Sequence, residues 1–137
     1  MLLYLAHSPD RLVGTEEIAN AYGISKHHLV RVVQTLAEHG FVEVKTGRSG
    51  GARLARTPGE INLGDVVRHT EQSFRMVECF EPETNTCPIV GICGLHPKLG
   101  EALEAFFAVL DRFTLADVTP SSDREQFFQI VGANTAP

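Results

Sequence analysis

The sequence lacks any apolar run long enough to cross a membrane, and its N-terminus shows neither a charged leader region nor a small-residue cleavage site. Cysteine is scarce as well: there are three, and an odd number in a chain of 137 residues argues against a disulfide scaffold. We therefore expect a cytoplasmic protein, whose thiols stay reduced and can bind metal. The length suits one compact domain, or a small domain with a dimerisation arm.

Signatures of catalysis are missing too. No nucleophile–base pair and no paired carboxylates stand out along the chain. The glycine-rich stretch at residues 47–51 lacks the G-K-[ST] sequence that opens the helix of a P-loop, and it lies between two predicted strands. The sequence predicts a protein that is not an enzyme.

Charge is unevenly distributed along the chain, whose net charge is −5. Residues 1–60 carry seven Lys or Arg and six Asp or Glu, whereas residues 61–137 carry five and eleven. A basic face in the first half can bind phosphate while the acidic second half points elsewhere.

Two short helices joined by a glycine-containing turn are predicted in the first half. Thr15 is the expected N-cap of the first helix, which ends at Gly23, and Ser25 caps the second over residues 26–39. Polar side chains at the start of the second helix are typical of a helix-turn-helix, whose second helix reads DNA. The side chains expected to face DNA from this helix are Ser25, Lys26, His27, His28, Arg31 and Gln34.

A β-hairpin is predicted directly after this helix. Residues 41–44 alternate as a strand, residues 45–51 form a basic, glycine-rich loop, and residues 52–54 return. Such a hairpin is a wing, although a plain solvated hairpin would show the same pattern. Lys45 and Arg53 are expected to contact phosphate, and Arg48 at the tip to enter a minor groove.

The second half is predicted to hold two further helices. Asn62 caps the first, over residues 63–71, and the second is a long amphipathic helix over residues 95–113. The apolar stripe of the long helix indicates pairing with a second copy, the alternative being burial within the same chain. From residue 119 a loose tail is expected, although its apolar residues could dock: Phe127, Phe128, Ile130 and Val131.

All three cysteines lie in one loop between these helices, at C-x7-C-x5-C, with a histidine three residues beyond the last. Clustering in a polar, proline- and glycine-interrupted loop favours a metal or cluster site over unrelated buried thiols. The residues Cys79, Cys87, Cys93 and His96 also form a legitimate Cys3His set for structural zinc, so a zinc-stabilised DNA-binding protein is the rival interpretation.

Several separate motifs resemble the NsrR repressors, the nitric-oxide-sensing group of a winged-helix iron–sulfur family that also includes IscR. They are Y-G-I-S-K-H-H-L-V-R-V-V, G-R-S-G-G-A-R-L, I-N-L-G-D-V-V-R, V-E-C-F-E-P-E-T-N-T-C-P-I-V-G-I-C-G-L and L-D-R-F-T-L-A-D-V, which together run nearly end to end. The resemblance implies a homodimeric DNA-binding repressor of palindromic operators, carrying an iron–sulfur cluster of the 4Fe-4S type that nitric oxide destroys. An IscR-like regulator of cluster biogenesis or redox stress, with a 2Fe-2S cluster, is the alternative within the family.

The resemblance also implies cluster ligands. Cys79, Cys87 and Cys93 match the family's cysteines, and His96 falls where IscR-like members have a histidine ligand. Some members instead take an Asp from the partner's first helix, but no Asp precedes Asp10 here, and the first helix is shorter than usual in the family.

The expected fold is mainly α with a small β-hairpin wing: a winged helix-turn-helix domain plus a long dimerisation helix. Its expected parts are residues 1–72 for DNA binding, residues 73–96 for the cluster loop, and residues 97–137 for the dimerisation helix and tail.

Overall fold

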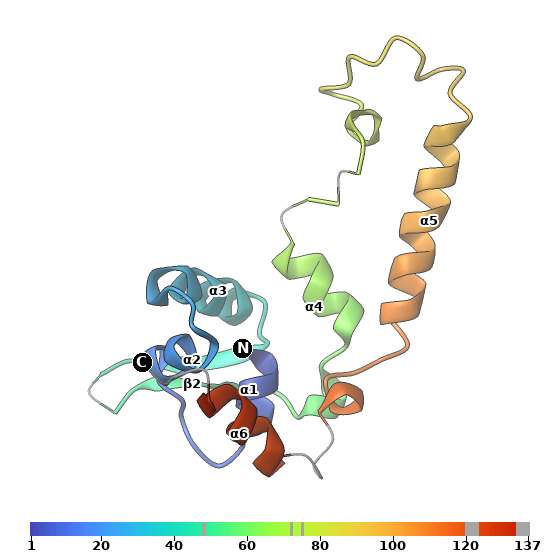
Figure 1. The fold of residues 1–137 in the computed structure, drawn as a ribbon. Coiled ribbons are helices and arrows are strands. Elements are labelled where there is room, and N and C mark those ends of the chain that lie inside the picture. The colour runs from blue at the N-terminus through green and yellow to red at the C-terminus, as the bar shows by residue number, and fades with distance from the viewer. Residues whose placement is uncertain (48, 72, 75, 120–123, 134–137) are drawn as a thin grey trace.

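The computed structural model has a packed body and a long arm that projects from it (Figure 1). It describes residues 1–47, 49–71, 73–74, 76–119 and 124–133. The elements follow one another as α1 (Leu2–Ala6), α2 (Thr15–Tyr22), α3 (Lys26–Glu38), β1 (Val42–Lys45), β2 (Gly51–Leu54), η1 (Pro58–Glu60), α4 (Leu63–Thr70), η2 (Glu78–Phe80), α5 (Leu95–Leu110), η3 (Ala116–Val118) and α6 (Arg124–Ala133). No helix in these described ranges is long and apolar enough to cross a bilayer.

Helices α2 and α3 form the predicted helix-turn-helix. The first of them begins one residue earlier than expected, because Gly14 rather than Thr15 is the extended N-cap and its carbonyl accepts the amide of Ile18. Gly23 ends α2 in the left-handed conformation at φ 62°, which a residue without a Cβ adopts freely. Ser25 is the N-cap of α3, as predicted.

The core of the body gathers side chains from distant parts of the sequence. The largest fully buried side chains are Leu5, Val13, Ile18, Leu29, Ile61 and Leu115. Helix α3 contributes Leu29, Val33 and Leu36 from one face, as its apolar spacing predicts. Each such side chain stabilises the folded state by about 1.5–3 kcal/mol through burial.

The wing is the two-stranded antiparallel sheet of β1 and β2, in which Val42 pairs with Leu54. A third segment joins it, since the amide and carbonyl of Val13 both bond to Ala52 at 2.9 Å. A Cβ on Gly51 would lie 2.6 Å from the carbonyl oxygen of Val13, so only glycine permits this approach. The mainly α fold with a hairpin wing is thereby confirmed.

The two ends of the arm lie side by side where they join the body, and we call this place, at residues 61–63 and 113–115, the neck. The amide of Leu115 donates to the carbonyl of Ile61 at 2.8 Å, and both side chains are buried. The amide of Leu63 donates to the carbonyl of Phe113 at 3.0 Å. Helix α5 ends at Leu110, three residues before the predicted end, because the chain turns there to make these neck contacts.

The C-terminal segment folds back onto the body as α6 (Figure 1). Phe127 stacks on His7 with ring centroids 4.1 Å apart, and Phe127 and Phe128 both meet the ring of Tyr4 edge-on. Val131 is buried in the core. For residues 124–133 the alternative to a loose tail is the one observed: Phe127, Phe128 and Val131 dock on the body, whereas Ile130 is 62% exposed.

Candidate DNA-reading surface and cysteine loop

The polar face of α3 is open to solvent. Its apolar face is buried against the body, which leaves the opposite side free along the whole helix. All six side chains predicted to meet DNA from this helix are exposed: Ser25, Lys26, His27, His28, Arg31 and Gln34. The structure therefore presents them together, on the helix that a helix-turn-helix places in the major groove.

Two of the basic side chains predicted to contact DNA, those of Lys26 and Arg53, form ion pairs with neighbouring carboxylates. Lys26 Nζ lies 2.8 Å from Glu16 Oε2, and this hydrogen bond lowers the pKa of the Glu16 carboxyl. On the wing, Arg53 donates through Nε and Nη2 to Glu43, its direct cross-strand partner, at 2.8 and 2.6 Å. Both pairs are exposed, so a phosphate can replace the carboxylate at little cost.

Lys45 is exposed at the end of β1, where the wing loop begins. Arg48, expected at the wing tip, lies outside the described residues. Sequence reasoning overlooked a further arginine, Arg56, whose guanidinium donates to the carbonyls of Gly40 at 3.1 Å and His39 at 3.3 Å. Arg56 therefore caps the C-terminal end of α3.

The cysteine loop connects α4 to α5 at the far end of the arm (Figure 1). Cys79, Cys87 and Cys93 are free thiols and all are half-buried. Within the described ranges, no three His, Cys, Asp or Glu side chains come together as a metal site. Three free, partly exposed thiols are the type of ligand that binds the iron of a cluster. In this conformation of the loop, however, the three cysteines are not close together.

Polar contacts order the loop next to two of its cysteines. Glu78 accepts the Thr86 hydroxyl at 2.6 Å and the Thr86 amide, and these bonds lower the pKa of the Glu78 carboxyl. Asn85 Oδ1 accepts the amide of Cys87 at 3.0 Å. The residues that precede Cys79 and Cys87 are therefore bonded to each other, a detail that the cysteine spacing does not reveal.

His96 lies in the first turn of α5 and faces Phe80 edge-on, with ring centroids 5.4 Å apart. A hollow of about 930 Å³ lies between the loop and α5. Cys79, Phe80 and His96 line it together with Leu103. Of the predicted cluster ligands, the structure brings Cys79 and His96 to one hollow.

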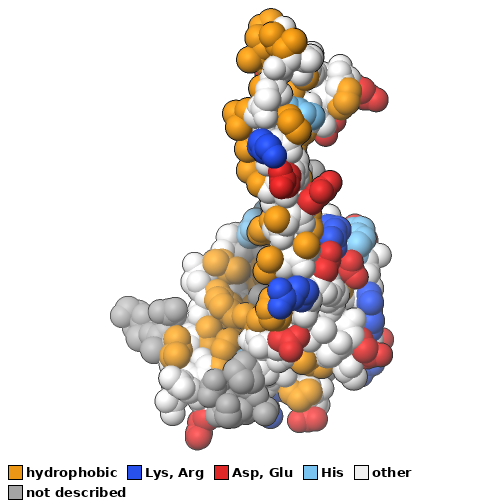
Figure 2. Space-filling model, turned by 90° about the vertical axis from the view of Figure 1, so that its right-hand side faces the viewer, with side chains coloured by type: hydrophobic (Ala, Val, Ile, Leu, Met, Phe, Trp, Pro, Cys, Tyr) orange, Lys and Arg blue, Asp and Glu red, His pale blue; other side chains and the backbone are white. Residues whose placement is uncertain are grey.

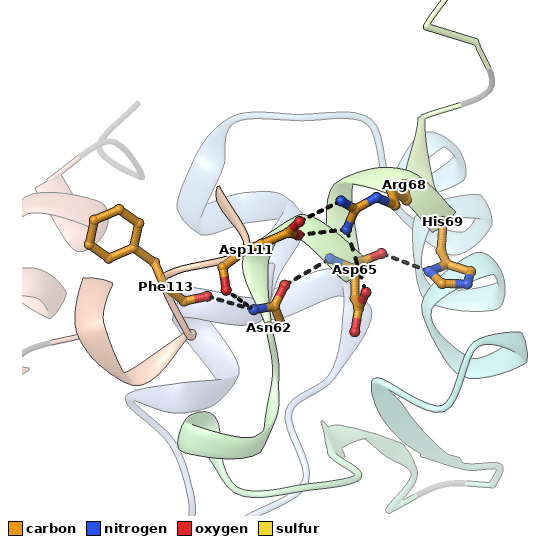
Figure 3. A network of polar contacts seen from close by, with 6 residues as sticks. All are labelled: Asn62, Asp65, Arg68, His69, Asp111 and Phe113. Atoms are coloured by element: carbon orange, nitrogen blue, oxygen red, sulfur yellow. Dashed lines mark hydrogen bonds and ion pairs between the residues drawn. The ribbon is translucent and has the colours of Figure 1, made fainter. Parts of the chain in front are cut away.

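A network of polar contacts joins α4 to the end of α5, and we call it the α4–α5 junction: Asn62, Asp65, Arg68, His69, Asp111 and Phe113 (Figure 3). Arg68 grips Asp111 with both of its terminal nitrogens, at 2.6 and 2.7 Å, and these bonds hold the pKa of the Asp111 carboxyl below its ordinary value. Asn62 uses Oδ1 to cap α4 through the Asp65 amide and Nδ2 to reach the Asp111 carbonyl at 2.8 Å. Capping by Asn62 was predicted, whereas the contacts to residue 111 were not.

Helix α4 in turn touches the end of α3. The ring of His69 lies 4.5 Å from that of His39, the C-cap of α3, and 5.9 Å from that of Phe41. The arm thus has a direct contact with the helix that carries the predicted DNA-reading residues.

Comparison with known proteins places this arrangement in a family. A family model described as Rrf2, iron-dependent transcriptional regulator, matches residues 1–121. The HTH-type transcriptional regulators NsrR of Bacillus licheniformis and Bacillus subtilis are each 45% identical over 124 residues, which cover 90% of this chain and 87% and 85% of those proteins. The resemblance to NsrR is thereby confirmed.

Solved structures agree with the sequence relatives. IscR of T. potens superposes with a TM-score of 0.68 at 25% identity, covering 91% of this chain and 82% of that one. CymR, the global cysteine regulator of B. subtilis, superposes with a TM-score of 0.61 at 27% identity, covering 86% of each chain. This protein therefore belongs to the Rrf2 family of DNA-binding transcriptional regulators, and it is not an enzyme.

Proposed function

We propose that this protein is a homodimeric repressor which binds a palindromic operator and releases it when nitric oxide attacks an iron–sulfur cluster on the cysteine loop. The similarity to NsrR over nine-tenths of the chain supports the proposal. In the proposed division of labour, residues 1–72 bind DNA, residues 73–96 hold the cluster, and residues 97–137 supply the dimer helix and the tail. The proposed site of action is the cytoplasm, where thiols stay reduced.

One observation carries the cluster proposal: three free thiols share the loop that joins α4 to α5. Cys79, Cys87 and Cys93 would hold the cluster, which we propose to be 4Fe-4S, and it would supply the iron that reacts with nitric oxide. Three thiolates leave one iron position to a different ligand. His96 is the candidate for that position, because it shares a hollow with Cys79.

The proposed DNA contacts divide into reading and positioning. The exposed face of α3 would enter the major groove, where Arg31 would bond a guanine. Lys45 and Arg53 on the wing would grip phosphates, once Arg53 exchanges Glu43 for DNA. Arg48 is proposed to enter a minor groove from the wing tip.

The proposed dimer rests on the apolar surface of α5. This helix of 16 residues has no buried side chain, and Leu95, Phe106 and Val109 are 60%, 48% and 52% exposed. Figure 2 looks at this side of the molecule and shows hydrophobic side chains at the tip of the arm and along its edge. A second copy packed on α5 would bury them and would match the two-fold symmetry of a palindrome.

The test is anaerobic purification and reconstitution with iron and sulfide, followed by metal analysis, visible spectra and DNA binding before and after nitric oxide. We expect a coloured protein with bound iron and sulfide that loses its operator on exposure to the gas. A colourless protein that carries zinc and binds DNA equally well with and without nitric oxide would refute the proposal.

A further inference from the structure

We infer that the Arg68–Asp111 pair is the joint through which the state of the cysteine loop reaches the recognition helix α3. The inference rests on the proposed function, since it concerns how the cluster-bearing arm controls DNA binding. It assigns to these two residues a positioning role in regulation, although neither is itself proposed to touch DNA or cluster, and Arg68 lines the hollow that Cys79 and His96 share.

The pair lies at the base of the arm, where the two legs of the arm meet. The cysteine loop starts after α4 ends at Thr70 and runs to the start of α5 at Leu95. A rearrangement of the loop therefore acts on both helices. Arg68 on α4 and Asp111 just beyond α5 are 43 residues apart in sequence, and their two parallel hydrogen bonds fix both distance and angle. The pair therefore links the two legs directly at the base of the arm.

The pair is closely packed against α4. A Cβ on Gly64 would lie 1.9 Å from Asp111 Oδ1, so a side chain at residue 64 would displace the carboxylate. The guanidinium of Arg68 also lies over the ring of Phe107, 4.4 Å from its centroid. The arginine thus touches α5 through both a carboxylate and an aromatic face, which a lysine could not reproduce.

From α4 the contact continues into α3. His69, next to Arg68, packs against His39 at the C-cap of α3. Val66 of α4 and Leu36 of α3 line the same hollow of about 850 Å³. A shift of α4 relative to the body therefore changes the support of the recognition helix.

An exposed ion pair contributes little to the stability of the fold. The role inferred for this pair is to couple the movement of α5 to that of α4. With the pair intact, α5 and α4 move as one unit, and loop rearrangement displaces α4 against α3. With the pair broken, α5 can swing while α4 stays in place. The variant would bind its operator almost equally with and without cluster.

The experiment compares operator affinity of cluster-loaded and cluster-free protein for each variant at one salt concentration. The DNA is the tightest-binding duplex that loaded wild-type protein selects from a random pool, and iron, sulfide and the visible spectrum report loading. The variants are Asp111→Asn, Arg68→Lys, which keeps the charge, and the double variant that carries both substitutions. The matched control is Glu101→Gln, which breaks the exposed Lys98–Glu101 pair on the same helix.

For the wild type we expect cluster loss to weaken binding by about 5- to 150-fold, the usual range of allosteric coupling. Asp111→Asn and Arg68→Lys are expected to reduce that ratio to a few-fold or less with loading unchanged, while the control keeps it. The double variant should match either single one, because the pair acts as a unit.

Three outcomes would overturn the inference while leaving the proposed function in place: an unchanged ratio in fully loaded variants, an equal loss of affinity in both states, or failure to load the cluster. A wild-type ratio of one would instead overturn the proposed function itself. If Asp111→Asn does not fold, the Arg68→Lys ratio decides, because that substitution preserves the positive charge.

Discussion

The body and the arm treat their apolar residues in opposite ways. In the body, side chains such as Leu29 and Ile61 are almost completely enclosed by other parts of the same chain. In the arm, none of the side chains of α5 is buried, and Ile92 in the cysteine loop is 88% exposed. The body therefore specifies its own structure, whereas the arm displays surfaces and ligands that a second copy and a cofactor would complete.

The largest expected effect separates cofactor binding in the arm from folding in the body. Cys87→Ala is expected to abolish iron and sulfide retention, because two thiolates do not hold a cluster. The free energy of unfolding of the cofactor-free protein, measured by thermal unfolding, should change by about 0.5 kcal/mol or less, as for other loop substitutions outside a core. Thr84→Ala in the same loop is the control, and a Cys87→Ala protein with full iron would remove this cysteine from the ligand set.

The next effect sets a core residue against a loop residue. Leu29→Ala should lower the free energy of unfolding by about 2–5 kcal/mol, because it leaves a cavity in the body. Ile92→Ala should cost about 0.5 kcal/mol or less, since its side chain is in solvent. Urea unfolding of cluster-free protein at low concentration measures both. Equal costs would mean that the arm has a core of its own, and the contrast between the regions would fail.

A charge on α5 should act on association and not on folding. Phe106→Glu is expected to weaken the dimer by about 2 kcal/mol or more, as for an aromatic residue at the centre of an interface. Ile130→Glu, at a residue of α6 that is 62% exposed against 48% for Phe106, is the matched control. Sedimentation velocity over a concentration series gives the dissociation constants, and a Phe106→Glu protein that dimerises normally would place the interface elsewhere.

The smallest expected effects concern DNA binding, and they distinguish a residue that reads bases, Arg31, from one that contacts phosphate, Lys45. Arg31→Ala should reduce discrimination between operator and random DNA by about 1–3 kcal/mol, the worth of a good base contact. Lys45→Ala should weaken binding to both alike and lower the slope of log affinity against log salt by about one unit. Titrations across salt concentrations supply both numbers. An equal loss on both DNAs for Arg31→Ala would assign this residue to the backbone.

The winged helix-turn-helix could be predicted because its local signals agree with its tertiary contacts. Gly23, Ser25 and the apolar spacing of α3 each mark a boundary or a face that packing then uses. The Gly14 cap was misjudged because Thr15 has the better capping side chain, while the chain path past Val13 decides where α2 starts.

The contacts of the arm could not be predicted in the same way. Arg68 and Asp111 carry no local pattern that relates them, and their pairing depends on how the neck brings distant segments together. In the body, the apolar residues of α6 indicated that the segment could dock, but not where, because its partners Tyr4 and His7 lie more than a hundred residues away. Cysteine spacing predicts donors, but it says nothing of how the loop arranges them before metal arrives.

The neck between Ile61 and Leu115 makes the arm an insertion whose two ends are already closed by the body. A change in the length of such an insertion costs only about 0.6 kcal/mol of closure entropy per doubling. The length of the arm and the chemistry at its tip can therefore change at little cost to the folding of the body.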